Sequence, residues 1–372
     1  MRGMSPATVV GPHRGPLYLV SMASYPNYGD ELIARRWLRH LARTRPNDEV
    51  WLDCRHPGTA SALFAGDHPR LRVTDAIFRA MADSLDRSGR EIEDIVANLG
   101  TPLYDSGLLR LREAQTLHLL GGGFVNAVWP ENALVVRAMR EAARISGAPL
   151  IATGQGLMPA GPEQLQGFDH VSVRDAPSAE LLGIEQGVDD AFLLDAPPAV
   201  TIGNHQVELV VCVQSDAQDE GVFDRFLDWT RGMIQASRIP RERVRYVEAL
   251  PGADYAGYDR QRDVVAEDGF VPFTSFWRGE LQPGPHQVWI TTRFHHHLVA
   301  AMHGARGIAL SGRSGYYDVK HGSLVDMGSG WHVTDGSDTA FPALATLQRP
   351  SGFAERGVRA KRAEAASLYG TT

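Results

Sequence analysis

Short apolar runs alternate along this chain with longer segments in which apolar residues recur every three or four positions. The short runs have the length of buried strands, and the longer segments have the period of helices that bury one face. The strands predicted in the first half are Leu17–Met22, Val50–Asp53, Leu117–Leu120, Pro149–Ala152 and His170–Val173. The helices predicted there lie at about 30–42, over much of 75–115, at 132–146 and after Asp175 as far as Leu182. Strands and helices in alternation predict a mostly parallel sheet.

The same alternation begins again after residues 195–206, which are rich in Pro, Ala and Gly and indicate a linker. The strands predicted in this second half are Glu208–Val213, Arg243–Val247, Gln287–Ile290 and Gly307–Leu310. The predicted helices lie at 222–236, near 259–266, from about 294 to 302, and at 355–367. We therefore predict an N-terminal α/β domain over 1–195, a C-terminal α/β domain over 207–345, and a final helix and tail over 346–372.

Composition argues against several classes of protein. With 372 residues, the chain is longer than one hydrophobic core usually organises. Its net charge of −7 argues against a general nucleic-acid binder. Cys54 and Cys212 are its only cysteines, so neither a cysteine-rich zinc site nor a disulfide framework is expected. We find no apolar signal sequence and no run near the ~20 apolar residues of a membrane span, so we expect a cytoplasmic enzyme.

An Arg and three His lie where a predicted strand ends and a predicted helix begins. The segment reads Thr291-Thr292-Arg293-Phe294-His295-His296-His297. Helix N-termini attract anions through unpaired N–H groups, and ligands of open α/β sheets bind beyond the carboxyl ends of the strands. Arg293 offers a planar fork for phosphate or carboxylate, and a neighbouring His exchanges a proton near neutral pH. The segment therefore predicts chemistry on a small anion.

Three adjacent His also invite a metal hypothesis, which geometry disfavours. Consecutive residues of a helix point about 100° apart, so the three side chains diverge. The sequence has no His-Glu-x-x-His spacing. We expect no metal ion, and we expect at least one of His295, His296 and His297 to be structural.

Two features of the first half each have a functional and a structural interpretation. The run Gly121-Gly122-Gly123 follows a predicted strand, where glycine lets the backbone approach a ligand closely. It lacks the spacing of a dinucleotide-binding or Walker loop, so a tight strand-to-helix turn is the alternative. Arg174 lies at the end of another predicted strand. It is a second candidate anion ligand, and the alternative is a surface ion pair with Asp175.

Two further features carry the same ambiguity. Lysine occurs only at Lys320 and Lys361, while every other strong cation is arginine. Lys320 is either an anion ligand or a solvated surface residue. Asp30 and Glu31 open a predicted helix, where acidic residues complement the helix dipole. The same carboxylates are suited to hold the hydroxyl groups of a sugar.

Several short motifs occur in the order found in the polysaccharide pyruvyl transferases, which the chain resembles over about residues 17–328. The matching stretches are Asn27-Tyr28-Gly29-Asp30-Glu31, Leu119–Gly123, Gly154-Gln155-Gly156, Arg174-Asp175 with Ser178, Asp190-Ala191-Phe192, Arg293-Phe294-His295 and Tyr317-Asp318-Val319-Lys320. One departure follows the strand Leu209–Val213, where relatives often have an Arg and this chain has Gln214-Ser215-Asp216. Each motif is short, and their shared order carries the resemblance.

The resemblance implies an α/β fold of two Rossmann-like domains that face each other across a cleft, as in the GT-B architecture. It implies transfer of the pyruvyl group of phosphoenolpyruvate onto two hydroxyls of a sugar in a cell-surface glycan or its precursor. The products are a ketal and phosphate, and no cofactor is needed beyond phosphoenolpyruvate as co-substrate. The N-terminal domain would hold the acceptor and part of the donor site, and the C-terminal domain would hold the donor.

The resemblance also implies the roles of individual residues. His295, Arg293 and Asp30 would be catalytic, with His295 as the general acid that protonates the enol carbon. The residues implied in substrate binding are Arg174, Lys320, Asn27, Gly29, Glu31, Gly122, Gly123, Gln155, Asp318 and Ser311.

Two other functions stay open at this point. A nucleotide-sugar glycosyltransferase of GT-B architecture would use the same cations for a diphosphate. A noncatalytic protein that binds anionic glycans would need the basic residues but not His295. The acceptor, sugar or lipid-linked glycan, stays open as well, as do association with the inner face of a membrane and homo-oligomerisation.

Overall fold

The computed structural model describes residues 15–86, 89–98, 105–161, 165–203, 206–216, 219–312, 315 and 317–370. Within these residues the strands form two six-stranded sheets, and the chain divides into two compact units. Unit 1 comprises the chain up to Tyr25, Asp30–Asp195 and the chain from Val358 onward. Unit 2 comprises Pro26–Gly29 and Ala196–Gly357. The predicted change of domain near residue 195 coincides with the end of the long stretch of unit 1.

The sheet of unit 1 has the strand order β3-β2-β1-β4-β5-β6, and every neighbouring pair is parallel. Its strands are β1 (Leu17–Val20), β2 (Val50–Asp53), β3 (Leu71–Thr74), β4 (Thr116–Leu119), β5 (Leu150–Gln155) and β6 (His170–Val173). Its helices are α1 (Tyr28–Thr44), α2 (Pro57–Leu63), α3 (Ala76–Asp86), α4 (Ile92–Ala97), α5 (Asp105–Arg112), η1 (Pro130–Asn132), α6 (Ala133–Ser146), α7 (Ala176–Leu182), η2 (Asp190–Phe192) and α13 (Phe353–Tyr369).

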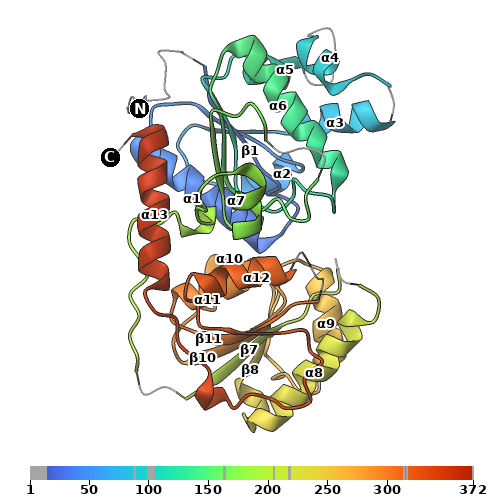
Figure 1. Ribbon diagram of the computed structural model, residues 1–372, viewed down its shortest axis with the longest axis vertical. Helices are drawn as coiled ribbons and strands as arrows, with labels where there is room; N and C mark the ends of the chain where they lie inside the picture. The colour runs from blue at the N-terminus through green and yellow to red at the C-terminus, as the bar shows by residue number, and fades with distance from the viewer. Residues whose placement is uncertain are drawn as a thin grey trace. The chain divides into compact units, whose positions relative to one another are not determined.

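Helices cover both faces of this sheet, which is why β1 and β4 are buried along their whole length (Figure 1). On one face, Tyr18 and Leu117 pack into a core with α3 to α6. On the other face, His118 of β4 contacts Trp37 of α1 and Tyr369 of α13. Strands buried on both sides are near-continuous apolar runs, as the sequence has them.

The sheet of unit 2 has the order β12-β11-β10-β7-β8-β9 and is also parallel throughout. Its strands are β7 (Glu208–Cys212), β8 (Val244–Val247), β9 (Phe270–Val271), β10 (Gln287–Thr291), β11 (Arg306–Leu310) and β12 (His332–Thr334). Its helices are α8 (Val222–Ser237), η3 (Arg241–Arg243), α9 (Ala253–Gln261), α10 (Phe273–Arg278), α11 (Phe294–Met302), α12 (Tyr317–Asp326) and η4 (Leu344–Thr346). No helix in the described part of the chain is long and apolar enough to cross a membrane.

The predicted mostly parallel α/β architecture is confirmed, together with all nine predicted strands. Three strands were not predicted: β3, β9 and β12. These strands are short or lie at the edge of a sheet, where exposure leaves little apolar pattern. The helix predicted near 259–266 is wrong in position, because α9 covers Ala253–Gln261 and has almost no amphipathic pattern to locate it.

A buried cluster of charged groups joins α13 to the rest of unit 1. Lys361 is fully buried, and its Nζ lies 2.7 Å from Oδ1 of Asp190 and 2.5 Å from Oε2 of Glu364. Oδ2 of Asp190 accepts hydrogen bonds from the Trp37 indole, the Thr153 hydroxyl and the backbone N–H of Gly121. Burial alone would lower the pKa of Lys361, but the two carboxylates raise it above its usual range. The ammonium therefore stays charged and holds the terminal helix against the sheet.

Substitution of Lys361 by Met should destabilise the protein strongly, because it leaves the Asp190 carboxylate buried without its cation. We expect a loss of about 3–5 kcal/mol in the free energy of unfolding, measured by chemical denaturation. Lys320→Met is the matched control, since Lys320 is partly exposed, and it should change stability little. Equal effects of the two substitutions would contradict a structural role for the buried pair.

Candidate functional site

The predicted transition from strand to helix at residues 291–294 is confirmed. Strand β10 ends at Thr291 and α11 begins at Phe294, so Arg293 is the residue that precedes the helix. The backbone N–H of Arg293 donates to Oγ1 of Thr291, which fixes the turn. The carboxyl end of a central strand and the N-terminus of a helix therefore meet at Arg293 and His295.

The guanidinium of Arg293 is held by two carboxylates of unit 2. Its Nε lies 2.9 Å from Oδ1 of the fully buried Asp254, and its Nη2 lies 2.7 Å from Oδ1 of Asp216. Oδ2 of Asp254 also accepts from the N–H groups of Ala249 and Leu250. Burial would lower the pKa of Arg293, but Asp254 and Asp216 raise it well above its usual range. The cation is thus fixed in place and largely neutralised.

His295 lies against the backbone of Gly29, although 265 residues separate the two positions. A Cβ atom placed on Gly29 would lie 1.8 Å from Nδ1 of His295, so the imidazole occupies the space of a side chain. The turn is anchored from both sides. Oδ1 of Asn27 accepts from the N–H of Gly29, and the N–H of Tyr28 donates to the carbonyl of Ala249. Two motifs found separately in the sequence therefore meet in unit 2.

His296 is enclosed by aromatic rings and is fully buried. Its ring centroid lies 5.8 Å from that of Tyr28, 5.3 Å from Phe276 and 5.4 Å from Trp289. Neither ring nitrogen has a hydrogen-bond partner among the described residues. Burial, with smaller contributions from Arg293 and His295, lowers the pKa of His296 to about 3, so the ring is neutral.

His297 is also fully buried, and it lies within a chain of hydrogen bonds that determines its tautomer. The carbonyl of Thr292 accepts from Nε2 of His321, so Nε2 carries the single proton of that ring. Nδ1 of His321 is therefore an acceptor, and it accepts from Nδ1 of His297. Nε2 of His297 in turn accepts from the hydroxyl of Ser329. Burial lowers the pKa of His297 well below its usual value. The expectation that at least one of the three His is structural is confirmed, and it holds for two of them.

The remaining candidates of unit 2 lie around α12. Nζ of Lys320 is 5.5 Å from the ring centroid of Tyr317, whose hydroxyl accepts from the amide of Gln214. Asp318 is exposed, and its Oδ1 accepts from the N–H of Val319. The N–H of Ser311, just beyond β11, donates to the carbonyl of Thr334. Lys320 is partly exposed. Its role as an anion ligand stays a prediction.

In unit 1 the glycine run and the Gly154-Gln155-Gly156 turn brace each other. The N–H of Gly156 donates to the carbonyl of Gly122, and Nε2 of the buried Gln155 donates to the carbonyls of Leu120 and Thr153. Gly154 has a φ of +56°, and a Cβ there would lie 2.7 Å from Oδ1 of Asp190. Gly123 is partly exposed at the end of the run. The packing around Asp190 therefore requires glycine at Gly121 and Gly154, whichever ligand these turns approach.

Arg174 is buried and paired, but with a different residue from the one considered in the sequence. Its Nη1 lies 2.7 Å from Oδ2 of Asp189, and the two side chains are only 3% and 1% exposed. The alternative of a surface ion pair with Asp175 is wrong, because Asp175 caps α7 by accepting from the N–H of Ser178. A role of Arg174 as an anion ligand stays a prediction.

The two acids at the start of α1 have different environments. Glu31 is fully buried, and its Oε1 accepts from the N–H of Ser24 at 2.7 Å. Asp30 is partly exposed, and its Oδ1 lies 3.6 Å from the Cβ position of Gly122. Glu31 is thus buried and bonded to the backbone, whereas Asp30 borders the glycine run. The predicted substrate-binding role of Glu31 stays a prediction.

The structure thus brings together predicted residues within each unit. Unit 2 brings together Asn27, Gly29, Arg293 and His295, and unit 1 brings together Asp30 and Gly122 beside Gln155. Sequence reasoning missed Asp254, Asp216 and Asp189, because a carboxylate that pairs with a distant arginine has no local pattern. No group of three or more His, Cys, Asp or Glu in the described part of the chain is arranged to hold a metal ion.

Comparisons with known proteins indicate a family and a fold class for this chain. The sequence profile of the family described as "Polysaccharide pyruvyl transferase" matches residues 27–314. No curated protein matches the chain. The UDP-GlcNAc 2-epimerase of Methanocaldococcus jannaschii is similar in structure, with a TM-score of 0.50, 10% identity and coverage of 94% of this chain and 99% of that one. The S. aureus MnaA–UDP structure has a TM-score of 0.51, 10% identity and coverage of 96% and 91%. At 10% sequence identity, the structural similarity concerns the fold alone. It confirms the predicted GT-B class.

Substitution of Gly29 by Ala should destabilise the protein and displace the His295 ring, because the new methyl group overlaps that ring. We expect a cost of about 1–3 kcal/mol in the free energy of unfolding, with a shift of the His295 resonances in NMR spectra. Gly58→Ala in α2 is the matched control, since no atom lies within 4 Å of its Cβ position. It should stabilise the helix by about 0.5–1 kcal/mol. A neutral Gly29→Ala with unmoved His295 signals would refute the contact.

The buried, neutral His296 should make the protein sensitive to acid. Its pKa in the folded state is about 3, so between this value and ~6.5 only the unfolded state binds the proton. Stability is therefore lost as pH falls below ~6.5, by at most about 1.4 kcal/mol per pH unit for one His. In His296→Leu, the free energy of unfolding should fall less steeply between pH 6 and pH 4. His332→Leu, at an exposed position of β12, should keep the slope of the parent protein.

Proposed function

The protein belongs to the polysaccharide pyruvyl transferase family, and on that basis we propose that it transfers the pyruvyl group of phosphoenolpyruvate to a sugar. The acceptor is a hexose of a cell-surface glycan or of its lipid-linked precursor. Two of its hydroxyls become bridged by the pyruvyl carbon as a cyclic ketal, and phosphate is released. The observation that carries this proposal is the contact of His295 with Gly29, next to the fixed guanidinium of Arg293.

His295 is the proposed proton donor because of its position and accessibility. It lies in the first turn of α11, where N–H groups and the helix dipole favour a bound anion. It is partly exposed, whereas His296 and His297 are buried and neutral. Of these three His, only His295 can then meet a substrate from solvent and deliver a proton to it.

The proposed reaction balances with these groups alone. His295 gives a proton to the methylene carbon of the enol, while a sugar hydroxyl oxygen forms a bond to the neighbouring carbon and loses its own proton. The bond between that carbon and the phosphate oxygen then breaks, and phosphate departs. The second hydroxyl forms the other bond to the same carbon and closes the ring. The proton of the first hydroxyl replaces the one that His295 gave, and the proton of the second leaves with the phosphate. General acid catalysis of this kind commonly contributes about 10²–10⁴-fold.

The fixed charges of unit 2 support binding of the donor. Phosphoenolpyruvate carries a phosphate and a carboxylate, and charge-assisted hydrogen bonds to such groups are among the stronger ones. Arg293 and Lys320 are the proposed partners in this unit. Because Asp254 and Asp216 already hold Arg293, its contribution is a guanidinium set in one orientation rather than a free charge.

The proposed acceptor group is Asp30. It is the partly exposed acid of α1, next to Gly122, and a carboxylate there can orient or deprotonate a sugar hydroxyl. Glu31, Asn27 and Gln155 support this region through their hydrogen bonds to backbone groups. We further propose that the reaction occurs in the cytoplasm, where phosphoenolpyruvate is available.

Replacement of His295 by Gln should lower kcat by about 10²–10⁴-fold while phosphoenolpyruvate still binds. The measurement is release of phosphate from phosphoenolpyruvate over a panel of hexosides and lipid-linked sugars, with donor affinity followed by calorimetry. His332→Gln is the control, since His332 is exposed on β12 of the same unit.

The same assay separates the proposed function from the alternatives. A glycosyltransferase or a noncatalytic glycan binder would release no phosphate from phosphoenolpyruvate with any acceptor. If His295→Gln kept its rate while His297→Gln lost it in a folded protein, the assignment of the proton donor would be wrong even though pyruvyl transfer remained.

A further inference from the structure

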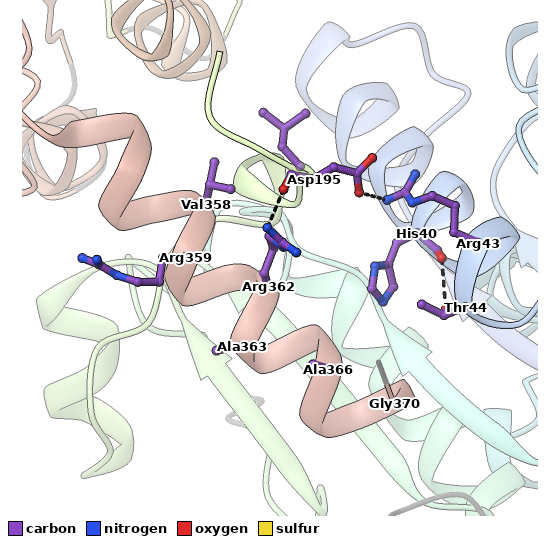
Figure 2. Close-up of a pocket in the computed structure, with 11 residues that line it drawn as sticks. His40, Arg43, Thr44, Asp195, Val358, Arg359, Arg362, Ala363, Ala366 and Gly370 are labelled. Carbon is purple, nitrogen blue, oxygen red and sulfur yellow. Dashed lines mark hydrogen bonds and ion pairs between the residues drawn. The ribbon is translucent and has the colours of Figure 1, made fainter. Parts of the chain in front are cut away.

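Unit 1 contains a cavity of about 590 Å³ between α1 and α13 (Figure 2). None of the residues proposed above to bind substrate lines this cavity. His40 and Arg43 line it from α1, Arg359 and Arg362 line it from α13, and Asp195 borders it from the segment after η2. The volume falls in the range of small-molecule sites, about 300–1,000 Å³.

This cavity is distinct from the residues proposed to bind the acceptor. His40 follows Asp30 by ten residues on the same helix, which is about 15 Å along its axis. The cavity also adjoins two of the four places where the chain passes from one unit to the other. Asp195 is the last residue of the long stretch of unit 1, and Val358, another lining residue, is the first residue of the returning stretch.

The charges that line the cavity are mostly positive. Arg43 pairs with Asp195 at 2.6 Å, but their side chains are 39% and 72% exposed. Arg362 donates only to the backbone carbonyl of Asp195, as Figure 2 shows, and so meets no carboxylate there. Arg359, which projects away from Asp195 at the rim, forms no ion pair among the described residues. The cavity is thus lined by three guanidinium groups and one carboxylate.

His40 lies in the same positively charged environment. Its Nε2 is buried and has no hydrogen-bond partner in the described part of the chain. Burial, with smaller contributions from Arg43 and Arg362, lowers the pKa of His40 to about 4, against the opposing effect of Asp195. The C-terminal ends of α1 and α13 bring partial negative charge to the cavity, of about half a unit each at most, which the arginines outweigh.

We propose that this cavity binds the phosphate group of a small molecule or a lipid, held by Arg43 and Arg362 in place of the Asp195 side chain. An exposed ion pair contributes at most about 1 kcal/mol, so the Asp195 carboxylate is easily displaced. A phosphate offers more acceptor oxygens and more charge to two guanidinium forks. Val358, Ala363 and Ala366 supply an apolar wall for the rest of the ligand.

Calorimetry on the full-length protein tests the proposal, with inorganic phosphate and glycerol 3-phosphate as probes. Arg43→Gln/Arg362→Gln should weaken binding about tenfold or more, because charge-assisted hydrogen bonds are lost. Asp195→Asn should tighten it about two- to fivefold, because the competing carboxylate is gone. Arg72→Gln, at an exposed position of β3, is the control and should bind as the parent protein does.

Sedimentation with vesicles identifies the source of the phosphate. Binding to phosphatidylglycerol vesicles but not to phosphatidylcholine vesicles, lost in Arg43→Gln/Arg362→Gln, indicates a lipid headgroup. Binding of the soluble probes without vesicle binding indicates a small molecule. The proposal is overturned if neither soluble probes nor anionic vesicles bind. It is equally overturned if binding in the double variant equals that of the parent, which would place the phosphate elsewhere, for instance where the proposed reaction releases it. None of these residues belongs to the proposed catalytic machinery, so the result stands whether or not the protein transfers pyruvate.

Discussion

The buried carboxylate of Asp190 is the interaction on which the geometry of unit 1 depends. A fully buried charge is tolerated only where a cation and hydrogen-bond donors surround it. Here Lys361 supplies the cation, and Trp37, Thr153 and Gly121 supply the donors. These partners come from α13, α1, β5 and the end of β4, so one residue ties together four segments that are far apart in the chain. Directly beside it, Asp189 holds the buried Arg174.

The same compensation recurs in unit 2 with the signs reversed. The cation Arg293 is central there, and Asp254 and Asp216 surround it. The buried His296 and His297 are neutral, because burial favours the uncharged ring and no carboxylate among the described residues pairs with them. Unit 2 thus contains a sharp division between an accessible imidazole at His295 and buried ones one and two positions later. This division follows from the 100° rotation between successive helix residues, which allows few of them to face the same way.

Close contacts of glycine with functional groups explain why short motifs of this chain contain it. Gly29 leaves room for the His295 ring, and Gly154 leaves room for Asp190. In both cases the neighbour is a charged or proton-carrying side chain contributed by a distant part of the sequence. Gly154 lies where the register of β5 against β6 shifts, between Ala152 and Gln155. Glycine in these motifs therefore serves to position side chains, in addition to any ligand that it admits.

The sequence by itself determined the alternation of strands and helices, the parallel α/β class and the place of the Arg293–His295 segment at the end of a strand. These features depend on apolar periodicity and on residues close together in the chain, so a local pattern suffices to predict them. It also predicted that the side chain of His295 points in a different direction from those of His296 and His297, because successive helix residues are rotated by about 100°. Only the tertiary structure decided which groups pair: Arg293 with Asp254, Arg174 with Asp189 rather than Asp175, and Lys361 with Asp190. Such pairings join residues up to 171 positions apart, and they depend on where the folded backbone places each charge, which no local pattern encodes.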